Sequence, residues 1–203
     1  MTSASMPTAA DSIDRGAWCL FLDRDGVINS RIMHGYVRSW EEFEFLPGAL
    51  DALVTLSTWA PRIVVVTNQQ GIAKGLMTPS DLSSIHARMR EAVVEAGGRI
   101  DAIEVCPHMA DAACACRKPQ PGMALRYLSA HPELDAARSV MVGDTDSDIE
   151  MGHRLSVITG GCHTVRIGAT HDVHAHETFP ALAAFASTIA TPTRSPRQDQ
   201  SVE

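Results

Sequence analysis

The segment WCLFLDRDGV, residues 18–27, joins an apolar run to two closely spaced acids. The run 18–22 is typical of a buried strand, and Asp23 and Asp25 stand where that strand would end. Side chains two residues apart leave a strand on the same side, so the two carboxylates should lie close together. Such a pair either binds a metal ion or divides the work of nucleophile and acid–base catalyst. A solvated aspartate turn is the alternative, and the apolar run and Gly26 argue against it.

Strand and helix patterns alternate along the rest of the chain. The clearest helix begins at Thr78, has Pro79 in its first position and ends at Gly97-Gly98. Further strands are predicted at 62–66, 102–105, 139–142 and 163–167, and weaker helices at 48–59, 121–130 and 146–155. This alternation predicts an α/β fold, with a doubly wound, Rossmann-like parallel sheet.

The composition of the 203 residues is that of an ordinary globular protein, with a net charge of −7 and no basic stripe. Nucleic acid is therefore not an expected partner. No apolar stretch approaches a membrane span, and the N-terminus lacks a secretory pattern. We expect a cytoplasmic protein without membrane association, monomeric, with one domain over 17–190 and flexible tails at 1–16 and 191–203.

Polar segments follow four of the predicted strands. They are Asp23 with Asp25, residues 67–71, residues 106–108 and residues 143–148. In open α/β sheets, ligands bind in the crevice beyond the carboxyl ends of the strands. We therefore expect these four loops to converge on one site.

The residues of these loops, taken with Lys118, supply the parts needed for phosphoryl transfer. Asp23 is a candidate nucleophile that would form an aspartyl-phosphate, and Asp25 is a candidate proton donor and acceptor. Asp144, together with Asp23, would hold a hard divalent cation, most naturally Mg2+. Thr67 and Lys118 would neutralise charge on the phosphoryl oxygens. Considered alone, Thr67 would be interpreted as an ordinary strand-end hydroxyl and Lys118 as a solvated surface lysine.

A second metal site is predicted from cysteine and histidine spacing. Three of the five cysteines fall within eleven residues, and a histidine lies among them. The candidate ligands are Cys106, His108, Cys114 and Cys116. Zn2+ takes such ligands in closed tetrahedral structural sites, and it would fold a loop that has little apolar content of its own.

Other possible ligands are expected to stay out of metal sites. Cys19 lies in the first predicted strand and Cys162 in a glycine-rich turn, while Asp111 is expected to be solvated. No predicted strand or helix positions His171, His174 and His176, which we interpret as part of a solvated segment.

The motifs together resemble those of the haloacid dehalogenase superfamily. The resemblance rests on the Asp-x-Asp-Gly-Val loop at 23–27, Thr67, Lys118 and the Gly143-Asp144-x-x-x-Asp148 segment. Within the superfamily the chain is most similar to the heptose-1,7-bisphosphate 7-phosphatases. The segments that carry this closer resemblance are 23–29, 34–36, 67–71, 106–108 and 114–119.

This resemblance implies hydrolysis of the C7 phosphate of a heptose bisphosphate. Asp23 would be the nucleophile and Asp25 the proton donor, with Mg2+ on Asp23, the backbone carbonyl of Asp25 and Asp144. Because no long insertion follows Asp25 or separates Thr67 from Lys118, the resemblance also implies an open site without a cap domain.

Substrate-binding residues are expected on three segments. His34, Gly35 and Tyr36 follow the nucleophile, where uncapped members of the superfamily select their substrate. Arg117 is the candidate for the remote phosphate, because its planar guanidinium matches two phosphate oxygens; the alternative is that it only neutralises the zinc–thiolate loop. Candidates to bind hydroxyls or phosphate are Asn68, Gln69 and Gln70. Relatives commonly carry a cation directly after Asp144, where this chain has Thr145.

Three other functions remain open from the sequence. A histidinol-phosphate phosphatase would share the same acids and the same short zinc loop. A catalytically inactive, zinc-stabilised binding module would be expected to lack Asp23, Asp25 or Lys118, all of which are present. A phosphotransferase usually encloses its site under a cap. The anomer of the heptose and the pathway that uses the product are not specified.

Overall fold

A six-stranded parallel sheet forms the centre of the protein, in the order β3-β2-β1-β4-β5-β6. The computed structural model describes residue 6 and residues 17–169 and 171–190. The strands are β1 (Cys19–Leu22), β2 (Arg62–Asn68), β3 (Ala102–Cys106), β4 (Val140–Gly143), β5 (His163–Ile167) and β6 (Glu177–Phe179). The α-helices are α2 (Ala49–Trp59), α3 (Pro79–Glu95), α4 (Gly122–Ala130), α5 (Asp146–Thr159) and α6 (Leu182–Ala190). Short 3-10 helices are η1 (Trp40–Glu42), η2 (Ala110–Ala112) and η3 (Ala136–Arg138).

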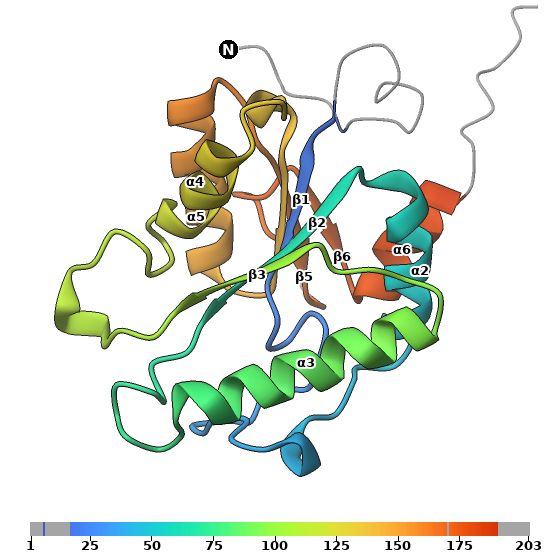
Figure 1. Ribbon diagram of the computed structural model, residues 1–203. Coiled ribbons are helices and arrows are strands. Elements are labelled where there is room, and N and C mark those ends of the chain that lie inside the picture. The colour runs from blue at the N-terminus through green and yellow to red at the C-terminus, as the bar shows by residue number, and fades with distance from the viewer. Residues whose placement is uncertain (1–5, 7–16, 170, 191–203) are drawn as a thin grey trace, which may run out of the picture.

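Helices cover both faces of the sheet (Figure 1). Leu20 and Leu22 of β1 point into the core layer that contains residues of α2, α3 and α6. Cys19 and Phe21, which alternate with them, point into the layer that contains residues of α4 and α5. All four side chains are fully buried. Burial on both faces explains why this strand reads as a continuous apolar run in the sequence.

The helix predicted from Thr78 is confirmed as α3. The hydroxyl of Thr78 accepts a hydrogen bond from the backbone N–H of Asp81 at 3.1 Å, and the carboxylate of Asp81 accepts one from the backbone N–H of Thr78 at 2.8 Å. This capping box satisfies two backbone donors that a helix start leaves unpaired. Beyond the last turn, Gly97 has a φ of 95°, which favours glycine and ends the helix.

The α/β fold and its parallel sheet are confirmed, with the predicted strands and helices in place and ends that differ by one or two residues, or by four at the end of α5. The edge strand β6 and the helix α6 were not predicted. Three residues are too few to show an alternating pattern, which accounts for β6. The apolar spacing of α6 was readable in the sequence; Phe185 packs against Trp59 of α2 with ring centroids 5.9 Å apart.

The predicted tails, 1–16 and 191–203, lie outside the described residues except for Met6, which is half-buried against the core. The single-domain boundaries therefore stay a prediction. Within the described part of the chain, no helix is long and apolar enough to cross a membrane.

Candidate active site and metal-binding loop

The acids predicted to act together do meet at the carboxyl ends of the strands. Asp23 follows β1, Asp144 follows β4, and Thr67 lies near the end of β2, all on the same edge of the sheet. A cavity of about 300 Å³ opens there. Its lining includes Asp23, Asp25, Thr67, Asn68, Gln69, Lys118, Thr145 and Ser147, together with Arg31 and residues 34–36.

Lys118, one of the lining residues, lies between two carboxylates. Its Nζ is 2.7 Å from Oδ1 of Asp23 and 2.6 Å from Oδ1 of Asp148, and it donates to the backbone carbonyl of Val66 at 3.0 Å. All three charged side chains are buried. The lysine is therefore not the solvated surface residue that it resembled when considered alone.

Burial and charge act in opposite directions on these groups. Burial raises the pKa of Asp23, and Lys118 only partly offsets this. Burial would lower the pKa of Lys118, but Asp148 and Asp23 outweigh it and raise that pKa. The ammonium group therefore stays charged, whereas Asp23 needs further positive charge nearby to be fully ionised at neutral pH.

Asp25 is held by a second set of hydrogen bonds. Arg24 donates through Nη2 to both oxygens of Asp25, at 2.9 and 3.0 Å. Asn29 donates to Oδ1 at 3.0 Å and Gln69 to Oδ2 at 2.9 Å. Burial alone would raise the pKa of Asp25, but Arg24 and these hydrogen bonds lower it. Gln69 also donates to the hydroxyl of Thr67 at 2.8 Å, so one amide orients two candidate catalytic groups.

The positively charged side chain of Arg31 lies among oxygen atoms of Asp23, Asp25 and Asp144. The guanidinium of Arg31 donates to the backbone carbonyl of Asp25 at 3.0 Å and to Oδ1 of Asp144 at 2.8 Å, and it lies 3.8 Å from Oδ2 of Asp23. Burial raises the pKa of Asp144 to about 6, and Arg31 works against this. Two carboxylates and a carbonyl arranged around one positive group fit the oxygen ligands that Mg2+ prefers. Carboxylate oxygens of Asp23, Asp144 and Asp148 lie within 4.8 Å of one another; we call these three residues the acid cluster.

Two glycines allow this close packing. A Cβ on Gly143 would lie 2.1 Å from the Cβ of Asp148, and one on Gly26 would lie 2.1 Å from Oδ2 of Asp144. Gly26 also has a φ of 94°, which side chains disfavour. A side chain at either glycine would therefore collide with an acid of this site.

Thr145, which directly follows Asp144, caps the helix α5. Its hydroxyl donates to Oδ2 of Asp148 at 2.6 Å and its backbone N–H donates to the same oxygen at 3.0 Å. The start of α5 is thereby fixed next to Asp144. Asp148 consequently has two partners, this cap and Lys118.

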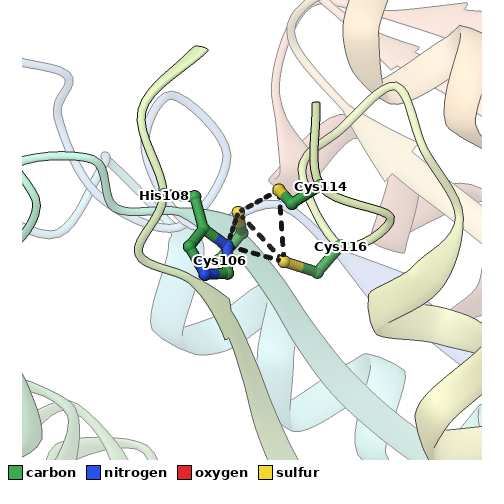
Figure 2. Close-up of side chains that lie close together, drawn as sticks. All are labelled: Cys106, His108, Cys114 and Cys116. Atoms are coloured by element: carbon green, nitrogen blue, oxygen red, sulfur yellow. Dashed lines mark hydrogen bonds between the residues drawn. The ribbon is translucent and has the colours of Figure 1, made fainter. Parts of the chain in front are cut away.

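The four predicted zinc ligands also come together, in a second group that we call the Cys/His cluster. Cys106 is the last residue of β3, and Cys114 and Cys116 lie on the loop that projects from the sheet before α4 (Figure 1). Figure 2 shows the three sulfurs and the Nδ1 of His108 pointing toward one another. The sulfur–sulfur distances are 3.3–3.6 Å, and Nδ1 lies 3.2 Å from Cys116 and 3.7 Å from Cys106.

These distances fit a tetrahedral metal site. Ligands of a tetrahedral Zn2+ at their usual bond lengths lie roughly 3.5–3.8 Å apart, so small outward shifts would complete the coordination. The cysteines are free thiols. As expected, Cys19 and Cys162 are buried elsewhere and Asp111 is exposed.

The Cys/His cluster is connected to the acid cluster through the segment that carries Lys118. The side chain of Asn68 accepts from the backbone N–H of Lys118 at 3.1 Å and donates to its carbonyl at 3.3 Å. Arg117 donates to the carbonyl of His108 at 3.3 Å. The loop closed by the four candidate ligands ends at Cys116, two residues before the lysine that contacts Asp23.

Known proteins that are similar to this chain are found both by sequence and by structure. A HAD-hydrolase-like family model matches residues 115–182. The D-glycero-alpha-D-manno-heptose-1,7-bisphosphate 7-phosphatase of Mycobacterium tuberculosis is 46% identical over 173 residues, 85% of this chain and 91% of that protein. The chain belongs to the heptose-1,7-bisphosphate 7-phosphatase family.

Two further relatives of the heptose phosphatase family agree with this assignment. The D-glycero-beta-D-manno-heptose-1,7-bisphosphate 7-phosphatase of Pseudomonas putida is 43% identical over 131 residues, 64% of this chain and 74% of that protein. The crystal structure of the D,D-heptose 1,7-bisphosphate phosphatase from B. bronchiseptica, complexed with magnesium and phosphate, superposes with a TM-score of 0.74 at 32% identity, covering 85% of this chain and 98% of that one. The resemblance to phosphatases of the haloacid dehalogenase superfamily is confirmed.

The predicted substrate-binding residues of this heptose phosphatase family member are only partly brought together. His34, Gly35, Tyr36, Asn68 and Gln69 line the cavity, and His34 has a φ of 56°, which is uncommon outside glycine. Arg117 and Gln70 are not among its lining residues. Gln70 instead donates to the hydroxyl of Tyr36 at 2.7 Å, and Arg117 donates to the carbonyl of His108 in the Cys/His cluster.

The histidines interpreted as a solvated segment are indeed exposed, but one of them is positioned by the sheet. His171, His174 and His176 are exposed, yet Nδ1 of His176 accepts from the backbone N–H of Thr164 at 3.1 Å. The expectation that no strand positions these histidines is wrong for His176, because it directly precedes the unpredicted strand β6. His176 belongs to neither of the two possible metal clusters found among the described residues.

Two arginines at the site were not predicted as functional. Arg24 has no exposed surface, and its position between Asp23 and Asp25 was the available signal: a charge next to a buried strand must find a partner. Arg31 gave no comparable signal, because its contact with Asp144 spans 113 positions of sequence.

Proposed function

We propose that this phosphatase hydrolyses the C7 phosphate of D-glycero-D-manno-heptose 1,7-bisphosphate through an aspartyl-phosphate on Asp23. The observation that carries the mechanism is that Asp23 and Asp25 line one cavity with different partners. Asp23 contacts an ammonium group, whereas Asp25 is fixed by Arg24, Asn29 and Gln69. The substrate assignment is supported by the named activity of the relatives at 46% and 43% identity.

The reaction then has two steps. An oxygen of Asp23 attacks phosphorus while the sugar oxygen leaves and takes a proton from Asp25. Asp25 next takes a proton from water, which attacks the phosphoryl group and releases phosphate and free Asp23. Lys118 and the hydroxyl of Thr67 stabilise charge on the phosphoryl oxygens in both steps.

Asp25 must carry a proton before the first step. Its pKa is lowered in the free protein by Arg24 and by hydrogen bonds, against the effect of burial. An arriving phosphate dianion places negative charge next to this carboxylate, which raises its pKa again. Binding of substrate would thereby favour the protonated acid that the leaving oxygen needs.

Asp23, the carbonyl of Asp25 and Asp144 would hold Mg2+, which neutralises phosphate charge and favours the ionised form of Asp23. Arg31 contacts these same oxygens and would move away when the ion binds. The Cys/His cluster would hold Zn2+ as a structural ion that fixes the loop ending at Lys118.

Substrate selection is assigned to the open side of the cavity. His34, Gly35 and Tyr36 would contact the sugar. Three neighbouring amides are better described as positioning residues. Asn68 binds the backbone of Lys118, Gln69 binds Asp25 and Thr67, and Gln70 binds Tyr36. Arg117 remains the candidate for the remote phosphate. A cytoplasmic location and a monomeric state stay predictions, and size-exclusion chromatography tests the second.

A phosphate-release assay over a panel of substrates tests this function. The panel contains both anomers of the heptose 1,7-bisphosphate, the heptose 1-phosphate and histidinol phosphate, each with Mg2+. We expect the bisphosphates to be hydrolysed at C7 only, with the alpha anomer preferred, as named for the relatives at 46% identity. A preference for histidinol phosphate would overturn the substrate assignment but leave the mechanism intact.

A further inference from the structure

His86 is a buried histidine of α3 that the reaction described above does not use. Only 8% of its surface is exposed. Its Nε2 lies 3.0 Å from Nη1 of Arg24, and Nη2 of the same guanidinium donates to both oxygens of Asp25. A chain of two contacts therefore links α3, which provides no residue to the catalytic motifs, to the candidate acid.

The contact with Arg24 determines the tautomer and the charge of the His86 imidazole. A guanidinium has donors only, so Nε2 must accept and the proton must sit on Nδ1. A protonated ring would have no acceptor to offer and would place a second positive charge beside Arg24. Burial, with Arg24 as the next cause, lowers the pKa of His86 to about 3, in agreement with a neutral ring.

The contact matters because Arg24 has few other partners. Its side chain has no exposed surface, and its Nε has no hydrogen-bond partner. Without His86, Nη1 would be a buried donor with nothing to bind, a state that proteins avoid. The guanidinium would turn toward other acceptors, and its two hydrogen bonds to Asp25 would be distorted with it.

We propose that His86 is a positioning residue for the reaction: it orients Arg24 and, through Arg24, the carboxylate of Asp25. This inference rests on the proposed role of Asp25 as proton donor and acceptor. It adds a residue outside the catalytic motifs, on a helix whose sequence otherwise reads as a core-packing element.

A matched pair of amides tests the geometry. In H86Q the side-chain carbonyl oxygen can reach the place of Nε2, whereas in H86N the same group is too short. We expect H86N to lower kcat by roughly 10-fold with little change in KM, because the acid is misplaced while phosphate binding is not. H86Q should stay within about twofold of the wild type. Equal losses in both variants, or wild-type kcat in H86N, would overturn the proposal.

Two further measurements test the His86–Arg24 contact and the role of Asp25 separately. Nitrogen-15 NMR of the wild-type protein should show one histidine as the neutral Nδ1–H tautomer at pH 5, with its signal lost in H86Q; a protonated ring there would refute the contact even if H86N does not fold. The variant D25N separates the two levels of inference. An active D25N would contradict the proposed role of Asp25, whereas an inactive D25N with a fully active H86N would contradict the role of His86 alone.

Discussion

The Cys/His cluster and the acid cluster are both groups of candidate metal ligands, yet the chain builds them in opposite ways. The four sulfur and nitrogen ligands lie within eleven residues, from the buried end of β3 along the loop that follows it. Of the three acids, Asp23 and Asp144 follow two separate strands and Asp148 lies in the first turn of α5; Asp23 and Asp148 are buried. We expect the first cluster to depend on an ion for the structure of its loop, whereas the second is already organised by the sheet and by Lys118.

This difference has a consequence for function. Removing an ion from the Cys/His cluster should disturb the loop and the position of Lys118. Removing one from the acid cluster should leave the fold intact and stop the chemistry.

The largest effect is expected for D23N. The amide cannot act as a nucleophile, so phosphate release should fall by roughly 1,000-fold or more. Zinc content, measured by plasma mass spectrometry, should not change, because Asp23 is no part of the Cys/His cluster. Activity near that of the wild type would refute the nucleophile assignment.

D144N should have the next largest effect. Loss of one carboxylate ligand should weaken Mg2+ binding by roughly 10- to 100-fold, measured by titration calorimetry, with activity partly restored at high Mg2+. D146N is the matched control, because Asp146 lies two residues away with its side chain 99% exposed. An equal loss in both variants would show that the effect is not due to metal ligation.

C116S tests the structural cluster. We expect loss of bound zinc, a decrease in Tm of roughly 5–10 °C, and a smaller loss of activity, about 10-fold, through the displaced Lys118. C162S is the control, since Cys162 is a buried thiol outside the cluster. An unchanged Tm with zinc lost would mean that the loop does not depend on the ion.

The smallest effect is expected for R31Q. Arg31 is an exposed side chain, so its ion pairs contribute at most about 1 kcal/mol to the free energy of unfolding. Because its guanidinium contacts the oxygens assigned to Mg2+, the variant should bind the ion slightly more tightly, by up to about threefold. R38Q, which removes an exposed arginine paired with Glu42, should leave Mg2+ affinity unchanged. Weaker Mg2+ binding in R31Q would contradict this competition.

Much of the fold was predictable because its signals are local. The run 18–22 is apolar because both faces of β1 are covered, and α3 begins directly after Thr78 because Thr78 and Asp81 cap each other. Of the two elements that were not predicted, β6 has no such signal. Its three residues form a strand only because β5 offers them an edge to pair with.

The candidate site likewise has residues that local sequence signals predict and contacts that they do not. The sequence by itself determined the identities and spacing of Asp23, Asp25 and the Cys/His cluster, because those residues lie close together along the chain. Only the tertiary structure decided that Lys118 lies between Asp23 and Asp148, that Arg31 contacts Asp144 and that His86 reaches Arg24. These contacts join residues 30 to 113 positions apart, across an edge that exists only when parallel strands align their carboxyl ends. No local pattern encodes such a contact, because its energy comes from burial and charge that the unfolded chain does not have.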